Sequence, residues 1–342
     1  MKQAVLQSAE EIIFHDVDFI ADLARNEILV HIKRIGVCGS DIHAYKGKHP
    51  FTPLPVVQGH EYSAEVINVG SSVSKFKKGD KVTGRPQLTC GMCNPCKSGK
   101  YNVCQELKVQ GFQAPGVAQD YFILPEDRAY KINGQVSFDE IALIEPAAVG
   151  AHCTSLIEDI HAKNIVISGA GPIGILIAQF AKAKGAKRIV VSDFNPFRLE
   201  MLHKLGITDT INLREESFGN GVRRILGDDG FQVGIEAVGH QAALDDLVAH
   251  VEKGGEVIIV GVYEEFPRVN MGFVGEYELT LKGSMMYKHE DYEEAIEFLN
   301  TNKINVKDMI THTFEFSDYN KAYKYINDNP NETLKVIINV ND

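Results

Sequence analysis

The chain has 342 residues, of which 44% are hydrophobic and 24% charged, and its formal net charge at pH 7 is −11. This length favours two domains over one, and the acidic balance argues against nucleic acid and anionic membranes as partners. The N-terminus lacks the apolar segment of a signal peptide, and no apolar run approaches the ~18 residues of a membrane span. We therefore expect a cytoplasmic protein, a compartment in which disulfides are rare.

Residues 1–150 predict strands joined by turns. Apolar and polar residues alternate in segments separated by Gly, Asp, Ser and Pro, namely EILVHIKRIGV (27–37), EYSAEVINVGSSV (61–73), GDKVTGR (79–85) and AQDYFILP (118–125). Such alternation is typical of strands with one buried face. The pattern predicts a barrel-like antiparallel β domain.

The pattern changes near residue 164. The continuous apolar run NIVISGAG (164–171) leads directly into the helical stretch PIGILIAQFAKAKGA (172–186), and strands then alternate with helices. This alternation predicts an α/β domain with a doubly wound parallel sheet, which we place at residues 151–288. The mixed segment 289–342 is expected to return to the first domain, so that the α/β unit is inserted in it.

The segment GAGPIG fits the G-x-G-x-x-G pattern, between a predicted strand and a predicted helix. In that context Gly169 permits a tight turn, Gly171 a close approach to a pyrophosphate, and Gly174 close helix–strand packing. Asp193 ends the next strand, where a carboxylate binds a ribose hydroxyl and favours NAD over NADP. Arg198 could partly accommodate a 2′-phosphate, and the plainer alternative for Asp193 is a cap on the helix that starts at Pro196.

Four of the six cysteines follow the spacing Cys90-x2-Cys93-x2-Cys96-x7-Cys104. Four thiolates at such short spacing satisfy tetrahedral Zn²⁺ and leave no open coordination position, so this zinc is predicted to be structural. An iron–sulfur cluster is the chemical alternative. Either way, the predicted chemistry lies elsewhere in the chain.

A second set of candidate ligands comes from two separate segments. VCGSDIH holds Cys38, Ser40, Asp41 and His43, and QGHEYSAEV places His60 next to Glu61 just before a strand. Cysteine, histidine and carboxylate groups from different segments can converge on a zinc ion that keeps a position for substrate. Taken singly, each residue has an ordinary structural explanation.

These motifs resemble the zinc-dependent medium-chain alcohol dehydrogenases, in the polyol branch that includes sorbitol, threonine, butanediol and sugar-acid dehydrogenases. The resemblance covers essentially the whole chain and rests on GVCGSDIH, GHEYSAEVINVGSSVSKFKKGDKV, the four-cysteine lobe, LIEPAAVGAH, GAGPIG and KGSMMY. It implies a Rossmann domain inserted in a GroES-like catalytic domain, and two zinc ions and NAD as cofactors. The implied catalytic zinc ligands are Cys38, His60, Glu61 and Glu145, whereas Cys153 is expected in core packing.

The resemblance also implies roles in catalysis and cofactor binding. A zinc-bound alcohol would lose its proton through Ser40 to His43 while its carbon delivers hydride to NAD. The alternative for His43 is a contact with the cofactor ribose without proton transfer. The remaining implied cofactor contacts are Ile173, Arg198, Val260, Gly261, Val262, Ser284 and Met285.

The small-molecule alcohol substrate is less sharply indicated. In the sorbitol dehydrogenases that this chain resembles, an arginine occupies the position of Met286. The short segment 47–61 is more similar to the corresponding segment of the sugar-acid dehydrogenases. Lys46, Lys48 and His49 could hold a carboxylate or form a solvated basic turn. We expect a polyol or a sugar acid such as L-galactonate or L-gulonate first, a vicinal diol second and L-threonine third.

The oligomeric state and a non-catalytic alternative also follow from these motifs. The resemblance implies a homodimer or homotetramer. A protein of another class, which binds zinc and NAD but has lost catalysis, is the alternative to an enzyme.

Overall fold

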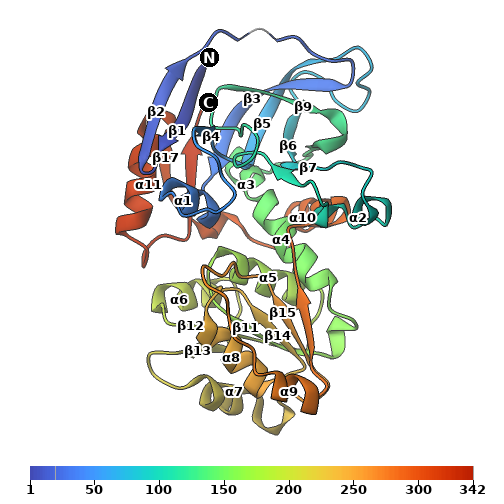
Figure 1. Cartoon of the computed structure of the whole chain (residues 1–342), viewed down its shortest axis with the longest axis vertical. Coiled ribbons are helices and arrows are strands. Elements are labelled where there is room, and N and C mark those ends of the chain that lie inside the picture. The colour runs from blue at the N-terminus through green and yellow to red at the C-terminus, as the bar shows by residue number, and fades with distance from the viewer. Residues whose placement is uncertain (20, 342) are drawn as a thin grey trace. The chain divides into compact units, whose positions relative to one another are not determined.

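The computed structural model describes residues 1–19 and 21–341 and divides into two compact units (Figure 1). The first unit is Met1–Glu145 with Val306–Asp342, and the second is Pro146–Asn305. Each unit is described by itself below. Among the described residues, no helix is both long and apolar enough to cross a membrane.

The first unit is built on a seven-stranded sheet in the order β10-β6-β5-β3-β18-β17, with β9 also paired to β3. Its strands are β3 (Glu27–Gly36), β5 (Glu61–Val69), β6 (Lys81–Gly84), β9 (Tyr121–Pro125), β10 (Ala129–Lys131), β17 (Ile310–Glu315) and β18 (Lys335–Asn339). All pairs are antiparallel except β17 with β18. Because β18 pairs with β3, the C-terminal strands β17 and β18 join the sheet of the first unit.

Smaller elements surround this sheet. Strands β1 (Lys2–Ser8), β2 (Glu11–Asp16) and β4 (Val56–Val57) form a second sheet, and β7 (Gln87–Leu88) pairs with β8 (Lys108–Val109). The helices are α1 (Gly39–Tyr45), α2 (Asn94–Lys97), α3 (Phe138–Ala142) and α11 (Tyr319–Asp328). Alternate residues of β3 and β5 share one hydrophobic core with Tyr319 and Tyr323 of α11, which explains the alternation seen in the sequence.

The second unit is a doubly wound α/β domain. Its sheet has the order β13-β12-β11-β14-β15-β16, and every pair is parallel. The strands are β11 (Asn164–Ser168), β12 (Arg188–Asp193), β13 (Thr210–Asn212), β14 (Val233–Glu236), β15 (Glu256–Ile259) and β16 (Thr280–Gly283). Every residue of β11 is buried, as expected for a parallel strand covered on both faces. The predicted fold class is confirmed.

Helices link these strands. They are α4 (Ile144–Ser155), α5 (Pro172–Ala183), α6 (Pro196–Lys204), α7 (Phe218–Leu226), α8 (Gln241–His250), α9 (Met271–Glu276) and α10 (His289–Asn300). Short 3₁₀ turns of this unit are Ile160–Ala162 and Gly227–Asp229, and those of the first unit are Tyr101–Val103, Glu126–Arg128, Lys307–Met309 and Phe316–Asp318.

The division between the units differs from the predicted boundaries at 150 and 288. Helix α10, which we expected in the C-terminal return, belongs to the second unit. Its Phe298 ring stacks on Phe180 at 5.3 Å, and its Glu294 pairs with Lys184 at 2.7 Å. The sequence shows a helix at 289–300, but only these long-range contacts assign it to a unit.

Candidate metal centres and cofactor site

The four-cysteine lobe brings its sulfur atoms together. The Sγ atoms of Cys90, Cys93, Cys96 and Cys104 all lie within 4.8 Å of one another. Cys104 Sγ lies 3.5 Å from Cys90 Sγ and 3.8 Å from Cys93 Sγ, and none of these cysteines is in a disulfide. The short helix α2 begins directly after Cys93 and carries Cys96, so local chain geometry sets the cluster. Four sulfurs at this separation fit one tetrahedral Zn²⁺.

Backbone N–H groups point at these sulfurs. The N–H of Cys90 donates to Cys104 Sγ at 3.3 Å, and that of Cys93 to Cys90 Sγ at 3.4 Å. Backbone hydrogen bonds from Gln105 and Cys96 lower the pKa of Cys93 to about 6. Desolvation and the neighbouring thiols raise the pKa of Cys96 to about 12. The lobe therefore forms its first thiolate readily, whereas complete ionisation needs a cation at the centre.

A second group of candidate ligands is assembled from distant segments. Cys38 precedes α1, and His60 and Glu61 stand at the start of β5. Their candidate ligand atoms, one from each side chain, lie within 4.8 Å of one another. His60 and Glu61 are buried, and a sulfur, a nitrogen and an oxygen donor fit the donor set of a catalytic zinc site.

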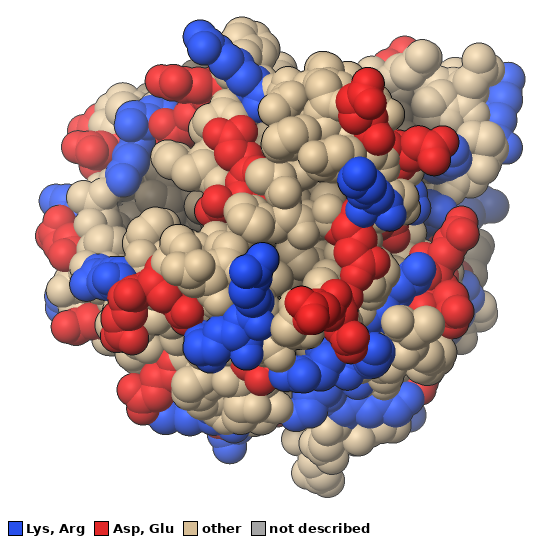
Figure 2. Space-filling view, turned by 90° about the horizontal axis from the view of Figure 1, so that it is seen from below, with Lys and Arg blue, Asp and Glu red and all other residues tan. Residues whose placement is uncertain are grey.

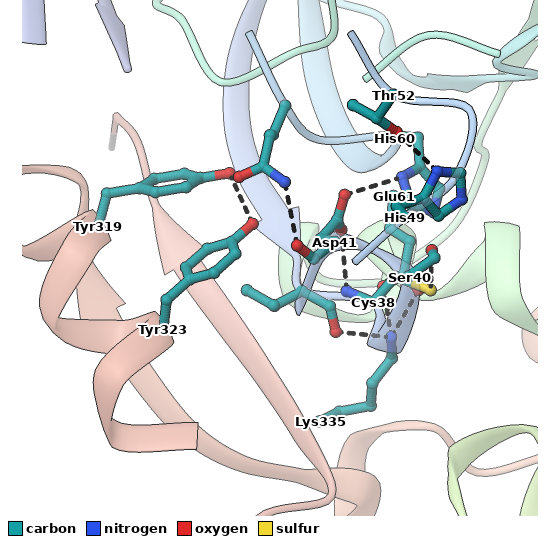
Figure 3. A network of polar contacts seen from close by, with 12 residues as sticks. Cys38, Ser40, Asp41, His49, Thr52, His60, Glu61, Tyr319, Tyr323 and Lys335 are labelled. Atoms are coloured by element: carbon teal, nitrogen blue, oxygen red, sulfur yellow. Dashed lines mark hydrogen bonds and ion pairs between the residues drawn. The ribbon is translucent and has the colours of Figure 1, made fainter. Parts of the chain in front are cut away.

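The buried Asp41 orients this group (Figure 3). Its Oδ2 accepts a hydrogen bond from the N–H of Cys38 at 3.0 Å, and its Oδ1 lies 3.4 Å from His60 Nδ1. Burial opposes protonation of His60, but the Asp41 carboxylate raises the pKa of His60 well above its usual range. A carboxylate at Nδ1 leaves Nε2 for the metal and raises its basicity.

Lys335 is a partner that sequence reasoning missed. Its Nζ contacts both carboxylate oxygens of Glu61, 2.6 Å from Oε1, and donates to the carbonyl of Val37 at 3.2 Å. Desolvation opposes its charge, but Glu61 and then Cys38 raise the pKa of Lys335. A lysine inside the buried strand LKVII was the available signal, because a buried lysine is normally paired.

The other predicted residues of this unit lie nearby. The Ser40 hydroxyl donates to Cys38 Sγ at 3.1 Å, and His43 follows on the last turn of α1. Glu145 is buried and acts electrostatically on both His60 and Lys335, but it is not one of the converging group. Cys153 is buried as expected for core packing.

In the second unit the glycine segment has the geometry of a phosphate-binding turn. Gly169 has φ +106°, in the region that favours glycine. A Cβ on Gly174 would lie 1.9 Å from the Gly169 carbonyl oxygen, whereas one on Gly171 would enter open space. Helix α5 begins directly after Gly171, so that space lies at a helix N-terminus and can take a pyrophosphate.

Asp193 ends β12 and ties this turn to the next loop. Its carboxylate accepts hydrogen bonds from the N–H of Ala170 and the N–H of Asn195, both at 2.7 Å. The helix cap of α6 is Asn195, which accepts from Phe197 N–H at 3.0 Å. The plain capping explanation for Asp193 therefore does not hold, and its position at the carboxyl end of the sheet fits a ribose contact.

The remaining predicted cofactor contacts occupy the same edge of this sheet or the helices that follow it. The N–H groups of Val260 and Gly261 donate to the carbonyl of Glu236, and the N–H of Ser284 donates to that of Ile259. Val262 and Met285 are exposed after β15 and β16. Ile173 lies on α5 and Arg198 on α6.

Charged side chains of both signs cover the face drawn in Figure 2, and on much of it acidic and basic side chains of the described residues are interspersed.

Known families match both units. The model of the alcohol dehydrogenase GroES-like domain matches residues 24–134, and that of the zinc-binding dehydrogenase matches residues 172–301. The chain is 35% identical to sorbitol dehydrogenase of Bacillus subtilis (99% of this chain, 97% of that protein). It is 32% identical to L-threonine 3-dehydrogenase of Alteromonas mediterranea (94% and 95%).

Solved structures of dehydrogenases resemble this chain along its whole length. An oxidoreductase of unknown specificity from Escherichia coli has a TM-score of 0.94 at 31% identity (100% of this chain, 99% of that chain). A zinc-binding dehydrogenase from Sinorhizobium meliloti bound to NADP (26%) and an Escherichia coli alcohol dehydrogenase complexed with NADH (27%) each have a TM-score of 0.90 and cover 99% of both chains. These matches support zinc and NAD as cofactors. The chain belongs to the zinc-dependent medium-chain alcohol dehydrogenases, in their polyol branch, and is an oxidoreductase.

Proposed function

We propose that this oxidoreductase transfers hydride from a secondary alcohol of a polyol or sugar acid, such as L-galactonate or L-gulonate, to NAD, giving a ketone. The observation that carries the proposal is the convergence of Cys38 with the buried His60 and Glu61 in a chain 35% identical to a sorbitol dehydrogenase. When bound, zinc supplies a Lewis acid that acidifies an alcohol, and NAD accepts hydride.

The residues of the first unit have distinct roles in this proposal. Cys38 and His60 hold the metal, with Glu61 and Glu145 as carboxylates that ligate or flank it. Ser40 Oγ receives the proton of the substrate hydroxyl and passes it to His43. Positions three apart on a helix share one face, which supports this relay on α1. The four-cysteine lobe holds a structural zinc.

The cofactor roles belong to the second unit. Gly169, Gly171 and Gly174 form the turn that receives the pyrophosphate, with Ile173 on the helix behind it. Asp193 accepts the ribose hydroxyl, with Arg198 near the adenosine. We assign the nicotinamide end to Val260, Gly261, Val262, Ser284 and Met285.

A butanediol or L-threonine dehydrogenase is the second candidate. The 32% identity to an L-threonine 3-dehydrogenase over most of both chains supports it. The segment IEPAAVGAH differs from the form typical of threonine dehydrogenases, so we rank threonine below a polyol or sugar acid.

The test is the formation of NADH by zinc-loaded protein with one panel of substrates: sorbitol, xylitol, L-galactonate, L-gulonate, 2,3-butanediol and L-threonine. The strongest signal is expected with polyols or sugar acids, followed by a weaker signal with the vicinal diol. A signal with L-threonine or 2,3-butanediol alone would replace the substrate class. Silence with zinc and NAD both bound would favour a non-catalytic protein.

The proposal includes assembly into a homodimer or homotetramer. Strand β16 is the edge of its sheet, and the exposed apolar side chains of Val262, Phe266 and Met271 lie in the segment between β15 and β16. Exposed edges and apolar side chains are common at contacts between chains. Light scattering would show a monomer if this part is wrong.

A further inference from the structure

His49 lies between α1 and β4, beside the candidate zinc group of the first unit (Figure 3). Its ring stacks on Phe112 with centroids 4.8 Å apart, and the Phe112 ring lies 5.1 Å from that of His60. The Thr52 hydroxyl lies 2.7 Å from His49 Nδ1. A stacked face and one bonded nitrogen restrict the ring, so His49 is held in a defined orientation.

The second ring nitrogen is left for another partner. No described residue forms a hydrogen bond with His49 Nε2 in this structure, and His49 is outside the group whose ligand atoms converge. The Thr52 hydroxyl can either donate to Nδ1 or accept from it, so Nε2 can either donate or accept. An alcohol hydroxyl does both and suits either tautomer, whereas a carboxylate suits only the tautomer that donates.

The surroundings of His49 are those of an uncharged ring. Burial, and then the neighbouring His43, lower the pKa of His49, while Asp41 opposes this and His60 adds to it. These interactions also show that His49 is within electrostatic reach of the candidate zinc group. A neutral ring beside that group is a hydrogen-bonding partner and not a counter-ion.

We propose, on the basis of the function proposed above, that His49 binds substrate through Nε2, at the hydroxyl next to the reacting carbinol. Phe112 spaces His49 from His60, so that His49 meets the neighbouring group of the substrate and not the metal. The site then recognises two neighbouring hydroxyl groups, which polyols and aldonates both carry. Thr52 acts as a positioning residue, since it acts through His49.

The test compares substrates that differ by one hydroxyl. His49→Phe keeps a ring to stack on Phe112 but removes both nitrogens. We expect kcat/KM to fall about tenfold with 2,3-butanediol and to stay unchanged with 2-butanol. A tenfold fall corresponds to about 1.4 kcal/mol, which lies within the roughly 0.5–1.5 kcal/mol net contribution of one hydrogen bond. His49→Gln, which can place an amide near the Nε2 position, should recover part of the loss. Thr52→Val should raise KM for the diol with little change in kcat.

Calorimetric titration of sorbitol and L-gulonate into the zinc-loaded protein with NADH gives a readout other than activity. His49→Phe should weaken the binding of sorbitol and of L-gulonate about tenfold each, because both carry a hydroxyl next to the reacting carbinol. Lys48→Met tests the alternative in which this basic turn holds a carboxylate, and it should leave both affinities unchanged if His49 binds the hydroxyl.

The outcomes separate the two proposals. Equal losses with 2,3-butanediol and 2-butanol would assign His49 a structural role and overturn the inference. A selective loss of L-gulonate binding, in either the His49 or the Lys48 variant, would establish carboxylate recognition instead. In both cases an active wild-type protein leaves the proposed function intact. A wild-type protein that binds zinc and NADH but oxidises no alcohol would overturn both proposals.

Discussion

The two candidate metal groups of the first unit are built in opposite ways. In the four-cysteine lobe all four candidate ligands are sulfur, and Cys90 and Cys104, whose sulfur atoms lie 3.5 Å apart, are separated by 14 positions in the chain. Three of the four cysteines are half-buried. In the second group, the sulfur of the half-buried Cys38 converges with nitrogen and oxygen donors of two buried residues, and the ion pair of Glu61 with Lys335 spans 274 residues. The first group depends on local chain geometry, and the second depends on the whole sheet.

This difference separates scaffold from chemistry. Four thiolates satisfy zinc completely, whereas three mixed donors leave a coordination position for substrate. The buried charge of Glu61 in the second group needs a partner of opposite charge, and that partner is Lys335 of β18. The charge balance of the second group therefore depends on the position of β18. Loss of a metal ligand from the first group should therefore affect stability, and loss of a metal ligand from the second should affect activity first.

The largest expected effect is on activity. Cys38→Ser should lower kcat/KM by about 10⁴-fold, about 5.5 kcal/mol of transition-state stabilisation, because the Lewis acid is no longer held in place. Zinc analysis should find one ion per chain instead of two. Two retained zinc ions with unchanged activity would contradict the assignment of Cys38.

The next effect tests the buried pair. Lys335→Met should lower the free energy of unfolding by roughly 3–5 kcal/mol, because it leaves the Glu61 charge buried without its partner. Since the pKa of Lys335 is raised, the contribution of this residue is present at neutral pH and is lost only as the pH rises through that raised pKa.

Denaturant unfolding of three variants checks this result. Lys335→Arg should keep most of the stability, and the double variant Glu61→Gln with Lys335→Met should be more stable than Lys335→Met alone. If the single and double variants were equally unstable, the loss would be due to packing and not to the unpaired charge.

A smaller effect is expected in the four-cysteine lobe. Cys93→Ser should lower the free energy of unfolding by roughly 2–3 kcal/mol, which corresponds to a hundredfold loss of zinc affinity in the folded state. The kcat of protein that remains folded should change little. Calorimetry with and without added zinc checks the stability, and a loss of kcat as large as that of Cys38→Ser would remove the distinction between the two groups.

The smallest expected effect is a change in stability at Asp80, which belongs to neither candidate metal group. Asp80 is buried and pairs with Lys131 at 2.9 Å, and its second oxygen accepts from the N–H of Lys77. Burial opposes ionisation, but Lys131 and the Lys77 N–H hold the pKa of Asp80 below its usual range. Asp80→Asn should therefore cost about 1 kcal/mol at pH 7.

The pH dependence follows from the direction of that shift. Stability from a lowered carboxyl pKa is present above the unfolded-state pKa of about 3.9 and is lost as the pH falls through the folded-state pKa. The difference in the free energy of unfolding between the wild type and Asp80→Asn should therefore shrink in acid urea titrations as the pH falls below about 3.9 and through the lowered folded-state pKa. A difference that stays constant through that fall in pH would show that the pair does not titrate as described.

Local patterns predicted much of this molecule. The buried run before GAGPIG predicted β11 and α5, because a parallel strand covered on both faces is continuously apolar. The spacing of Cys90, Cys93, Cys96 and Cys104 predicted a sulfur cluster, because neighbours in sequence cannot be far apart in space. In both cases the relevant interactions lie within a few residues.

The sequence by itself determined the fold class, the glycine turn and the four-cysteine cluster, because each depends on periodicity or short spacing. The tertiary structure decided the assignment of α10, the pairing of Lys335 with Glu61, and the position of His49 on Phe112. Those features depend on which distant surfaces meet when the core is buried. Burial is a property of the whole fold, and a residue's neighbours in the chain do not reveal it.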